Sequence, residues 1–497
     1  MNEMRPRFLA LFLLCAIAGA GARDWAQVPA SATITILHVN DIHSIDPIDG
    51  GRRGGLGRVS TLLQQLKRTH APVLMTLGGD YLSPSAVGTA VVDGEPLAGR
   101  EMVDALNALG LDWAVFGNHE FDLSEKAFRV RLAETRFHIV SSNVTDASGQ
   151  PFPGTVRSAV VPVDVRGRTI RLGLIGLTTD LNRRAYVRYA PPVESAREQI
   201  TQLKGKVDAV IALTHLPLED DQELVVQVPE IDLVLGGHEH ENFQVRRGRD
   251  FTPIIKADSN VRSASVVTLA FGKPGTRPSI SARLETIDDS IRQDPKVDGV
   301  VRKWTAAAFD AFRKNGFEPE RTVAVIDEPL DGRDAIVRNQ PGRLTDLVAA
   351  GFDREAGPVD LAIVNGGSIR VNDVIQPGPV TEYDVIRILP FGGRVTRASF
   401  DGALLLSVLD IGMKNQGAGG YLHVRGVVRV GGRWLVKGKP IDPAARYVVA
   451  ATDFLLSGGE TNLGFLTRTN PAVHDVQEFG DVRQALIREL RARYSTQ

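Results

Sequence analysis

The chain has 497 residues, which is too long for a single hydrophobic core and predicts at least two domains. Its composition, 43% hydrophobic and 24% charged residues, is typical of a soluble globular protein. The formal net charge of -1 and the lack of basic blocks in the sequence argue against a nucleic-acid polymer or an anionic membrane surface as partner.

Residues 1–22 have the layout of a secretory signal peptide. A short basic start, MNEMRPR, precedes the apolar run FLALFLLCAIAGA, and small residues lie before Arg23. The apolar run is short for a bilayer span, so a cleaved signal is favoured over a membrane anchor, with no transmembrane span after cleavage. We therefore expect an exported protein, periplasmic or extracellular. Cys15, the single cysteine, lies in this segment, so any metal in the mature chain must be held by His, Asp, Asn or Glu.

After the signal, apolar runs alternate with amphipathic stretches. The runs typical of buried strands are 33–39, 72–79, 113–117, 170–178, 208–215 and 232–238. Amphipathic stretches at 58–68 and 99–110 have helical spacing. This alternation predicts a layered α/β architecture.

The pattern changes beyond residue 281. Residues 294–317 have the apolar spacing of a helix, and a second α/β region follows from about Arg321, with strand-like runs within 360–370, 394–412 and 447–459. We predict a first domain at 33–285, a connecting helix or linker at 286–320 and a second domain at 321–497. One large domain with a long excursion is the alternative.

Polar side chains gather where the first-half strands end. The motifs NDIH, GGD, GNHEFD, THLP and GGHEH supply Asp41, His43, Asp80, Asn118, His119, Asp122, His215, His238 and His240. A single Asp or His after a strand more often satisfies a turn than binds a ligand. Five such strand ends favour a shared site, because strand ends of an α/β sheet line one crevice.

Convergent Asp, His and Asn side chains without Cys suit borderline metals such as Zn or Mn. A carboxylate can bridge two ions, and two ions about 3.5–4 Å apart can clamp the attacking and leaving oxygens of a displacement at phosphorus. Cations also lower the pKa of bound water. The pattern therefore predicts hydrolysis of a phosphoester by a metal-activated hydroxide.

In this order, the five motifs resemble those of the calcineurin-like metallophosphoesterases, and more narrowly the secreted 5'-nucleotidase/UDP-sugar hydrolase family. The resemblance implies an N-terminal layered β-sandwich flanked by helices and a C-terminal α/β 5'-nucleotidase-type domain. It also implies two divalent metal ions (Zn, Mn or similar). One would be held by Asp41, His43 and His240, the other by Asn118, His215 and His238, with Asp80 bridging. Many relatives have Asn or Gln at the position of His240.

The resemblance gives His119 and Asp122 catalytic roles. His119 would stabilise the phosphoryl oxygens or protonate the leaving alkoxide, and Asp122 would orient its imidazole. The alternative is structural: His119 would bond nearby backbone, and Asp122 would cap the following helix.

Three runs in the second half are candidates for substrate recognition. VNGGSIR places Asn365 and Arg370 around two glycines, which allow close backbone approach, and an arginine fork fits phosphate. Phe391 and Phe454 precede glycine pairs in LPFGG and DFLLSGGETN, where exposed rings can stack on a base, although a core position is the more usual one for Phe. The resemblance implies that Asn365 and Arg370 bind phosphate and that both rings bind the base.

The second half also departs from the family pattern. Glu460, the expected ribose acceptor, stands where relatives usually have Asp, and NQPGRLTDL at 339–347 replaces their GNL helix start. Arg338 is the expected second phosphate-binding arginine, with Arg333 as competitor.

These observations predict an exported phosphohydrolase acting on nucleotides, with nucleotide sugars or cyclic nucleotides as further substrates. The alternatives are a 2',3'-cyclic phosphodiesterase, a thiosulfohydrolase like those of sulfur oxidation, and a non-catalytic protein that binds nucleotide or metal.

Overall fold

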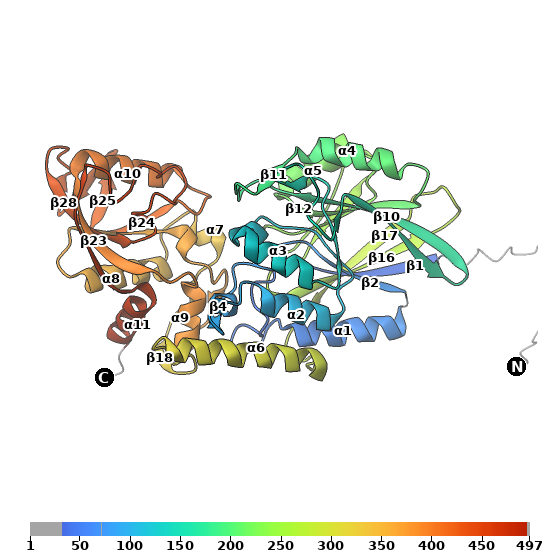
Figure 1. Cartoon of the computed structure of the whole chain (residues 1–497), viewed down its shortest axis with the longest axis horizontal. Coiled ribbons are helices and arrows are strands. Elements are labelled where there is room, and N and C mark those ends of the chain that lie inside the picture. The colour runs from blue at the N-terminus through green and yellow to red at the C-terminus, as the bar shows by residue number, and fades with distance from the viewer. Residues whose placement is uncertain (1–31, 71, 495–497) are drawn as a thin grey trace, which may run out of the picture.

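The computed structural model describes residues 32–70 and 72–494, so the predicted signal peptide at 1–22 lies outside the described residues. Two parts lie side by side, an N-terminal part ending with β17 (Ser279–Thr286) and a C-terminal part beginning with β18 (Thr322–Ile326) (Figure 1). Helix α6 (Pro295–Lys314) runs along the base of both. The predicted domain limits stay predictions. Within the described ranges, no helix is both long and apolar enough to cross a bilayer.

Two sheets form the N-terminal part. The seven-stranded sheet has the order β17, β16 (Ser263–Phe271), β1 (Ala32–Val39), β2 (Val73–Leu77), β5 (Trp113–Ala114), β6 (His138–Val140) and β8 (Thr155–Val156). The six-stranded sheet has the order β14 (Phe243–Arg247), β15 (Thr252–Lys256), β13 (Leu233–Gly236), β12 (Ala209–His215), β10 (Arg168–Thr178) and β9 (Ser158–Val165).

The two sheets pack face to face around one apolar core that includes Ile34, Ile36, Leu172 and Ile211. Helices α1 (Leu56–Thr69), α2 (Arg100–Leu109) and α3 (Glu125–Glu134) pack on the outer side of the seven-stranded sheet. Helices α4 (Pro192–Leu203) and α5 (Leu218–Gln227) cover the other sheet. The predicted layered sandwich flanked by helices is confirmed.

The C-terminal part is built on a five-stranded sheet, with the order β24 (Leu422–Arg425), β20 (Leu361–Asn365), β28 (Arg446–Thr452), β23 (Arg394–Asp401) and β29 (Val473–Asp481). One face packs against α8 (Arg343–Ala356) and α11 (Val482–Arg493), and the other against α10 (Gly402–Lys414). This is the mixed α/β domain that the sequence predicts.

Shorter elements complete the chain. They are β3 (Val91–Val92), β4 (Glu95–Pro96), β7 (Val144–Asp146), β11 (Val187–Tyr189), β19 (Leu330–Asp331), α7 (Asp334–Val337), β21 (Val374–Ile375), β22 (Gly378–Thr381), α9 (Glu382–Ile388), β25 (Val427–Val430), β26 (Arg433–Val436) and β27 (Lys439–Pro440). Single 3-10 turns lie at Val87–Thr89, His119–Asp122 and Gly366–Ser368.

Helix α6 joins the two parts by packing against both. The Asp294 side chain caps its first turn by accepting a hydrogen bond from the Lys296 N–H. Trp304 is buried, and its Nε1 donates to Asp104 on α2 over 2.9 Å. Further along, the ring of Phe309 lies 4.8 Å from that of Tyr383 on α9. The helix therefore fixes how the C-terminal part sits on the N-terminal part.

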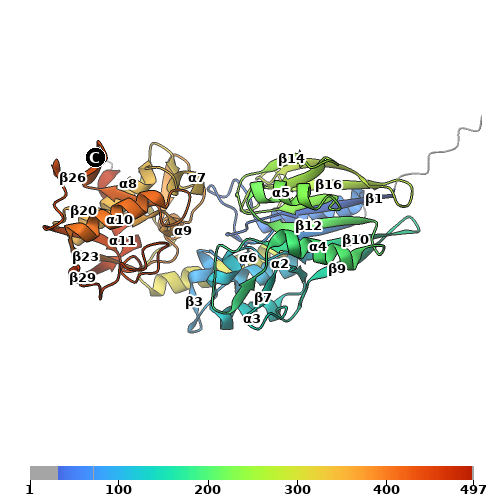
Figure 2. The same ribbon diagram turned by 90° about the horizontal axis from the view of Figure 1, so that it is seen from above.

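Strand direction brings the polar motifs to one edge. β1, β2 and β5 are parallel neighbours in one sheet, and β12 and β13 are parallel neighbours in the other. In both views β1 starts on the side away from the C-terminal part, so the carboxyl ends of these strands face that part (Figure 2). The loops that carry the five motifs thus lie opposite the C-terminal part.

Candidate active site

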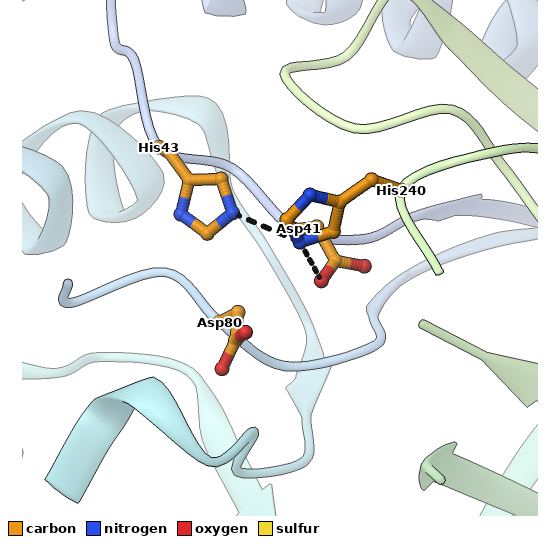
Figure 3. A group of neighbouring side chains, drawn as sticks. All are labelled: Asp41, His43, Asp80 and His240. Carbon is orange, nitrogen blue, oxygen red and sulfur yellow. Dashed lines mark hydrogen bonds and ion pairs between the residues drawn. The ribbon is translucent and has the colours of Figure 1, made fainter. Parts of the chain in front are cut away.

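Four predicted metal ligands form a compact cluster. Asp41, His43, Asp80 and His240 each offer one donor atom, and these atoms lie within 4.8 Å of one another (Figure 3). His240 Nε2 is 3.2 Å from Asp41 Oδ1 and 3.4 Å from His43 Nε2. The side chains come from the loops after β1, β2 and β13 and point toward one centre.

His215 borders this cluster beside Asp80, and His238 lies next to His215. His215 Nε2 lies 3.2 Å from Asp80 Oδ2 and 4.0 Å from Asp41 Oδ1. Its Nδ1 donates to the Gly78 carbonyl over 2.7 Å, so the opposite nitrogen, Nε2, faces the carboxylates. The His238 ring meets the His215 ring edge-on with centroids 5.2 Å apart, and Asn118 is buried. Asp80 therefore lies within the four-residue cluster and also beside His215.

The donor atoms of the cluster and of the predicted ligands around it fit a divalent cation. Within residues 32–70 and 72–494, the buried atoms Asp41 Oδ1, Asn118 Oδ1 and His215 Nε2 have no hydrogen-bond partner. Buried polar atoms are rarely left unpaired in folded proteins. Carboxylate, amide and imidazole donors are those that Zn and Mn accept.

Burial and neighbouring charges give the histidines of the site different pKa values. His43 and His238 are neutral, and His215 carries a positive charge. Burial, with a neighbouring histidine in each case, lowers the pKa of His43 and of His238 to about 3, so both rings keep a free lone pair at neutral pH. Burial also lowers the pKa of His215, but the carboxylates of Asp80 and Asp41 outweigh it and raise that pKa to about 10. The two carboxylates thus stabilise a cation at the centre.

The backbone is strained at the same place. Asp41, Asp80, His238 and His240 have φ of 51°, 55°, 94° and 64°, a region that costs a residue with a side chain about 1–3 kcal/mol. Gly117 makes room for the cluster, because a Cβ there would lie 2.0 Å from Asp80 Oδ1. Such strain is typical of functional sites, where the surrounding structure holds it in place.

His119 and Asp122 form a hydrogen-bonded pair beside the cluster. His119 Nδ1 is 2.7 Å from Asp122 Oδ2, and the His119 backbone N–H donates to Asp80 Oδ1 over 2.8 Å. Burial raises the pKa of Asp122, but His119 outweighs this and the net pKa is lowered. Ser124, not Asp122, caps α3, so the capping alternative is wrong for Asp122.

A cavity of about 1020 Å³ lies between the two parts, directly over this pair. Arg370 also lies on its wall and contacts His119 directly, with Nη2 2.8 Å from Nε2. The predicted residues on its walls are His119, Asp122, Asn365, Arg370, Phe391, Phe454 and Glu460. Phe391 and Phe454 are 57% and 45% exposed as whole residues, so neither is the core residue that the alternative supposed. The volume is of the size that small-molecule sites have.

On the wall of the cavity formed by the C-terminal part, the polar side chains are hydrogen-bonded to one another. Asn365 Nδ2 donates to Glu460 Oε2 over 2.6 Å, and Asn365 Oδ1 accepts from Ser368 over 2.5 Å. Glu460 Oε1 accepts from the Thr461 N–H over 2.7 Å. The glutamate therefore reaches the cavity with its carboxylate already oriented.

The two candidate arginines just before the altered segment, Arg338 and Arg333, differ in their surroundings. Arg338 pairs with Asp334 over 2.6 Å; burial lowers its pKa, Asp334 raises it, and the nearby Arg370 lowers it again. Arg333 is held by both oxygens of Asp331. Arg338 is thus the one close to Arg370, although it is not among the residues that line the large cavity.

Comparison with known proteins matches both parts. Residues 34–242 match the calcineurin-like phosphoesterase family and residues 322–467 match the 5'-nucleotidase C-terminal domain. The chain belongs to the 5'-nucleotidase family of calcineurin-like metallophosphoesterases, which are hydrolases.

Named relatives are similar over most of the chain. A trifunctional nucleotide phosphoesterase, YfkN of Bacillus subtilis, is 27% identical over 79% of this chain, which spans 28% of that protein. The 5'-nucleotidase of Vibrio cholerae is 24% identical over 91% of this chain and 90% of its own. The solved 5'-nucleotidase precursor of Thermus thermophilus has a TM-score of 0.75 at 24% identity, covering 93% of this chain and 97% of its own, and shows the shared fold.

Glu120 and Asn182 support residues of the same site, and the sequence did not single them out. Glu120 is fully buried and accepts from the N–H groups of Asp80, Tyr81, Leu82 and Gly117. Asn182 Nδ2 donates to Asp122 Oδ1 over 2.7 Å. Glu120 stands inside the GNHEFD motif, which is a usable signal, whereas Asn182 lies on the loop after β10 with no motif around it.

Replacing Glu120 with Gln tests the support of the Asp80 loop. Each carboxylate oxygen of Glu120 accepts two N–H groups, and an amide NH₂ in place of one oxygen would face two donors. We expect a metal affinity about 10–100-fold weaker, the usual loss when a group supporting a metal ligand is removed. Metal titration with a competing chelator measures it, and an affinity equal to that of the wild type would contradict the role.

Proposed function

We propose that the protein is an exported, metal-dependent phosphohydrolase that releases phosphate from nucleotides. The observation that carries the proposal is the cavity between the two parts, which opens over the His119–Asp122 pair and has exposed aromatic rings on its opposite wall. Membership of a family with named 5'-nucleotidases supports the substrate class. The layout of residues 1–22 supports export.

The ligands proposed for a metal pair are those that converge beside this cavity. Asp41, His43 and His240 would hold one ion, Asn118, His215 and His238 the other, and Asp80 both. Bound divalent ions would supply Lewis acidity toward the phosphoryl group and lower the pKa of a water molecule. Zn and Mn both suit these donors.

His119 is proposed to act on the phosphoryl and leaving-group oxygens. Asp122 holds Nδ1, so Nε2 faces the other way, and Arg370 Nη2 lies 2.8 Å from it. A phosphoryl group that replaced this direct contact would accept hydrogen bonds from the guanidinium and from a proton on Nε2. A protonated His119 would also donate its Nε2 proton to the departing alkoxide.

The opposite wall is proposed to bind the rest of the nucleotide. Phe391 and Phe454 would stack on the base, and Glu460 would accept a ribose hydroxyl. Arg370, Arg338 and Asn365 would contact phosphate oxygens. Asp334, which pairs with Arg338, would orient that guanidinium.

Replacing His119 with Ala separates catalysis from metal binding. We expect turnover to fall about 10²–10⁴-fold, because a proton-transferring and charge-stabilising group is lost, while metal content stays the same. His70→Ala, an exposed histidine in the first helix's C-terminal cap, is the matched control and should keep full turnover. Phosphate release and metal analysis on the same samples decide it, and an unchanged turnover in His119→Ala refutes the role.

Replacing Phe391 or Phe454 with Ala tests nucleotide recognition. Stacking on a base contributes about 1–3 kcal/mol, so each variant should raise KM for AMP about 5- to 150-fold. KM for a small ester without a base, such as p-nitrophenyl phosphate, should change little. Phe251→Ala, with a ring 69% exposed on a remote turn, is the control.

A substrate panel decides between the remaining functions. AMP, UDP-glucose, a 2',3'-cyclic nucleotide and a thiosulfonate are compared with and without a chelator. The proposal expects metal-dependent hydrolysis of the nucleotides. Turnover of the thiosulfonate alone would favour a thiosulfohydrolase, and tight AMP binding without phosphate release would leave a non-catalytic binding protein.

A further inference from the structure

A fully buried lysine lies directly behind the proposed metal ligands. Lys256 ends strand β15, is 0% exposed, and lies 2.9 Å from Asp221 Oδ2. Its Nζ donates to Glu239 Oε2 over 2.6 Å and to the carbonyls of Leu216 and Gly237 over 2.7 and 2.9 Å. An ammonium so far from water is stable only with such partners.

The partners of Lys256 follow a pattern along the chain. Leu216 directly follows His215, Gly237 directly precedes His238, and Glu239 stands between His238 and His240. One ammonium therefore contacts the backbone or side chain next to three of the proposed metal ligands. The loops that it joins come from two different strands, β12 and β13.

We infer that Lys256 is a positioning residue that sets the direction of these three imidazoles toward the metal centre; the inference rests on the proposed metal-dependent function. Two carbonyls drawn to the same ammonium fix the peptide planes beside His215 and His238. Both carboxylate oxygens of Glu239 are hydrogen-bonded, because Oε2 accepts from Lys256 and Oε1 accepts from the Leu218 N–H. The positive φ of His238 and His240 needs such support.

A purely structural role is the competing explanation. In that case Lys256 would only neutralise Asp221 and Glu239, and its loss would weaken the whole fold without a particular effect on metal binding. The two roles differ in one observable, the stabilisation that a metal adds to the folded protein.

The test compares Mn²⁺ binding and thermal unfolding in the full-length purified protein. Lys256→Met removes the ammonium, and Glu239→Gln keeps an acceptor for Leu218 while breaking the charged contact. Glu239→Gln leaves the Lys256–Asp221 pair in place, so it remains informative if Lys256→Met fails to fold. We expect Mn²⁺ affinity to fall about 10–100-fold and the rise in Tm on adding Mn²⁺ to shrink.

Glu382→Gln is the matched control. Glu382 belongs to α9 in the C-terminal part and, like Lys256, is 0% exposed. It accepts hydrogen bonds from Arg321 over 2.8 Å and from the Glu318 N–H over 2.7 Å. This variant should lower Tm with chelator present but keep the wild-type Mn²⁺ affinity and the wild-type Tm rise.

The outcomes separate this inference from the proposed function. Wild-type protein that binds Mn²⁺, with variants that melt earlier yet bind it equally well, would overturn the positioning role alone. Wild-type protein that binds neither Mn²⁺ nor Zn²⁺ would overturn the proposed function, and the inference with it.

Discussion

The structure of the site depends on two buried carboxylates, Asp41 and Asp80, that lie side by side almost without exposure to water. Within the described chain their contacts are histidines, Asn40 and backbone N–H groups. A carboxylate in such a place is stable only when cations or hydrogen bonds offset its charge. Three features hold these two acids in place. Their backbone is in a strained conformation, Gly117 has no Cβ that would collide with Asp80, and Glu120 accepts four N–H groups around the Asp80 loop. This arrangement suits a bound cation.

The two parts of the chain contribute different kinds of groups to the site. The edge of the sandwich collects groups that suit a metal and a proton donor, and the C-terminal part supplies aromatic rings, guanidinium and amide groups across the cavity. The proposed activity would use both walls, because the proposed metal ligands lie on one and the proposed base- and phosphate-binding groups lie on the other. Helix α6, packed against α2 through Trp304 and against α9 through Phe309, sets the spacing between them. His119 of the N-terminal part and Arg370 of the C-terminal part are in direct contact at this cavity.

Much of this was readable in the sequence because ligand-bearing motifs sit at strand ends, where topology forces them together. The layered fold and the grouping of Asp41, His43, Asp80 and His240 follow from that rule. The sequence did not reveal contacts that form between loops of separate elements. Asn182 reaches Asp122 from the loop after β10, and Lys256 meets its partners across two strands, so neither has a local signal. The predicted strand at 113–117 was too long: β5 ends at Ala114, because the chain already turns toward Asn118.

The central claim is that Asp80 is shared by two bound cations. A crystal structure of the protein soaked with Mn²⁺, with anomalous difference maps recorded at the manganese edge, tests it most directly. The account predicts two peaks about 3.5–4 Å apart, with the Asp80 carboxylate touching both. A single peak, or two peaks of which only one contacts Asp80, would contradict it.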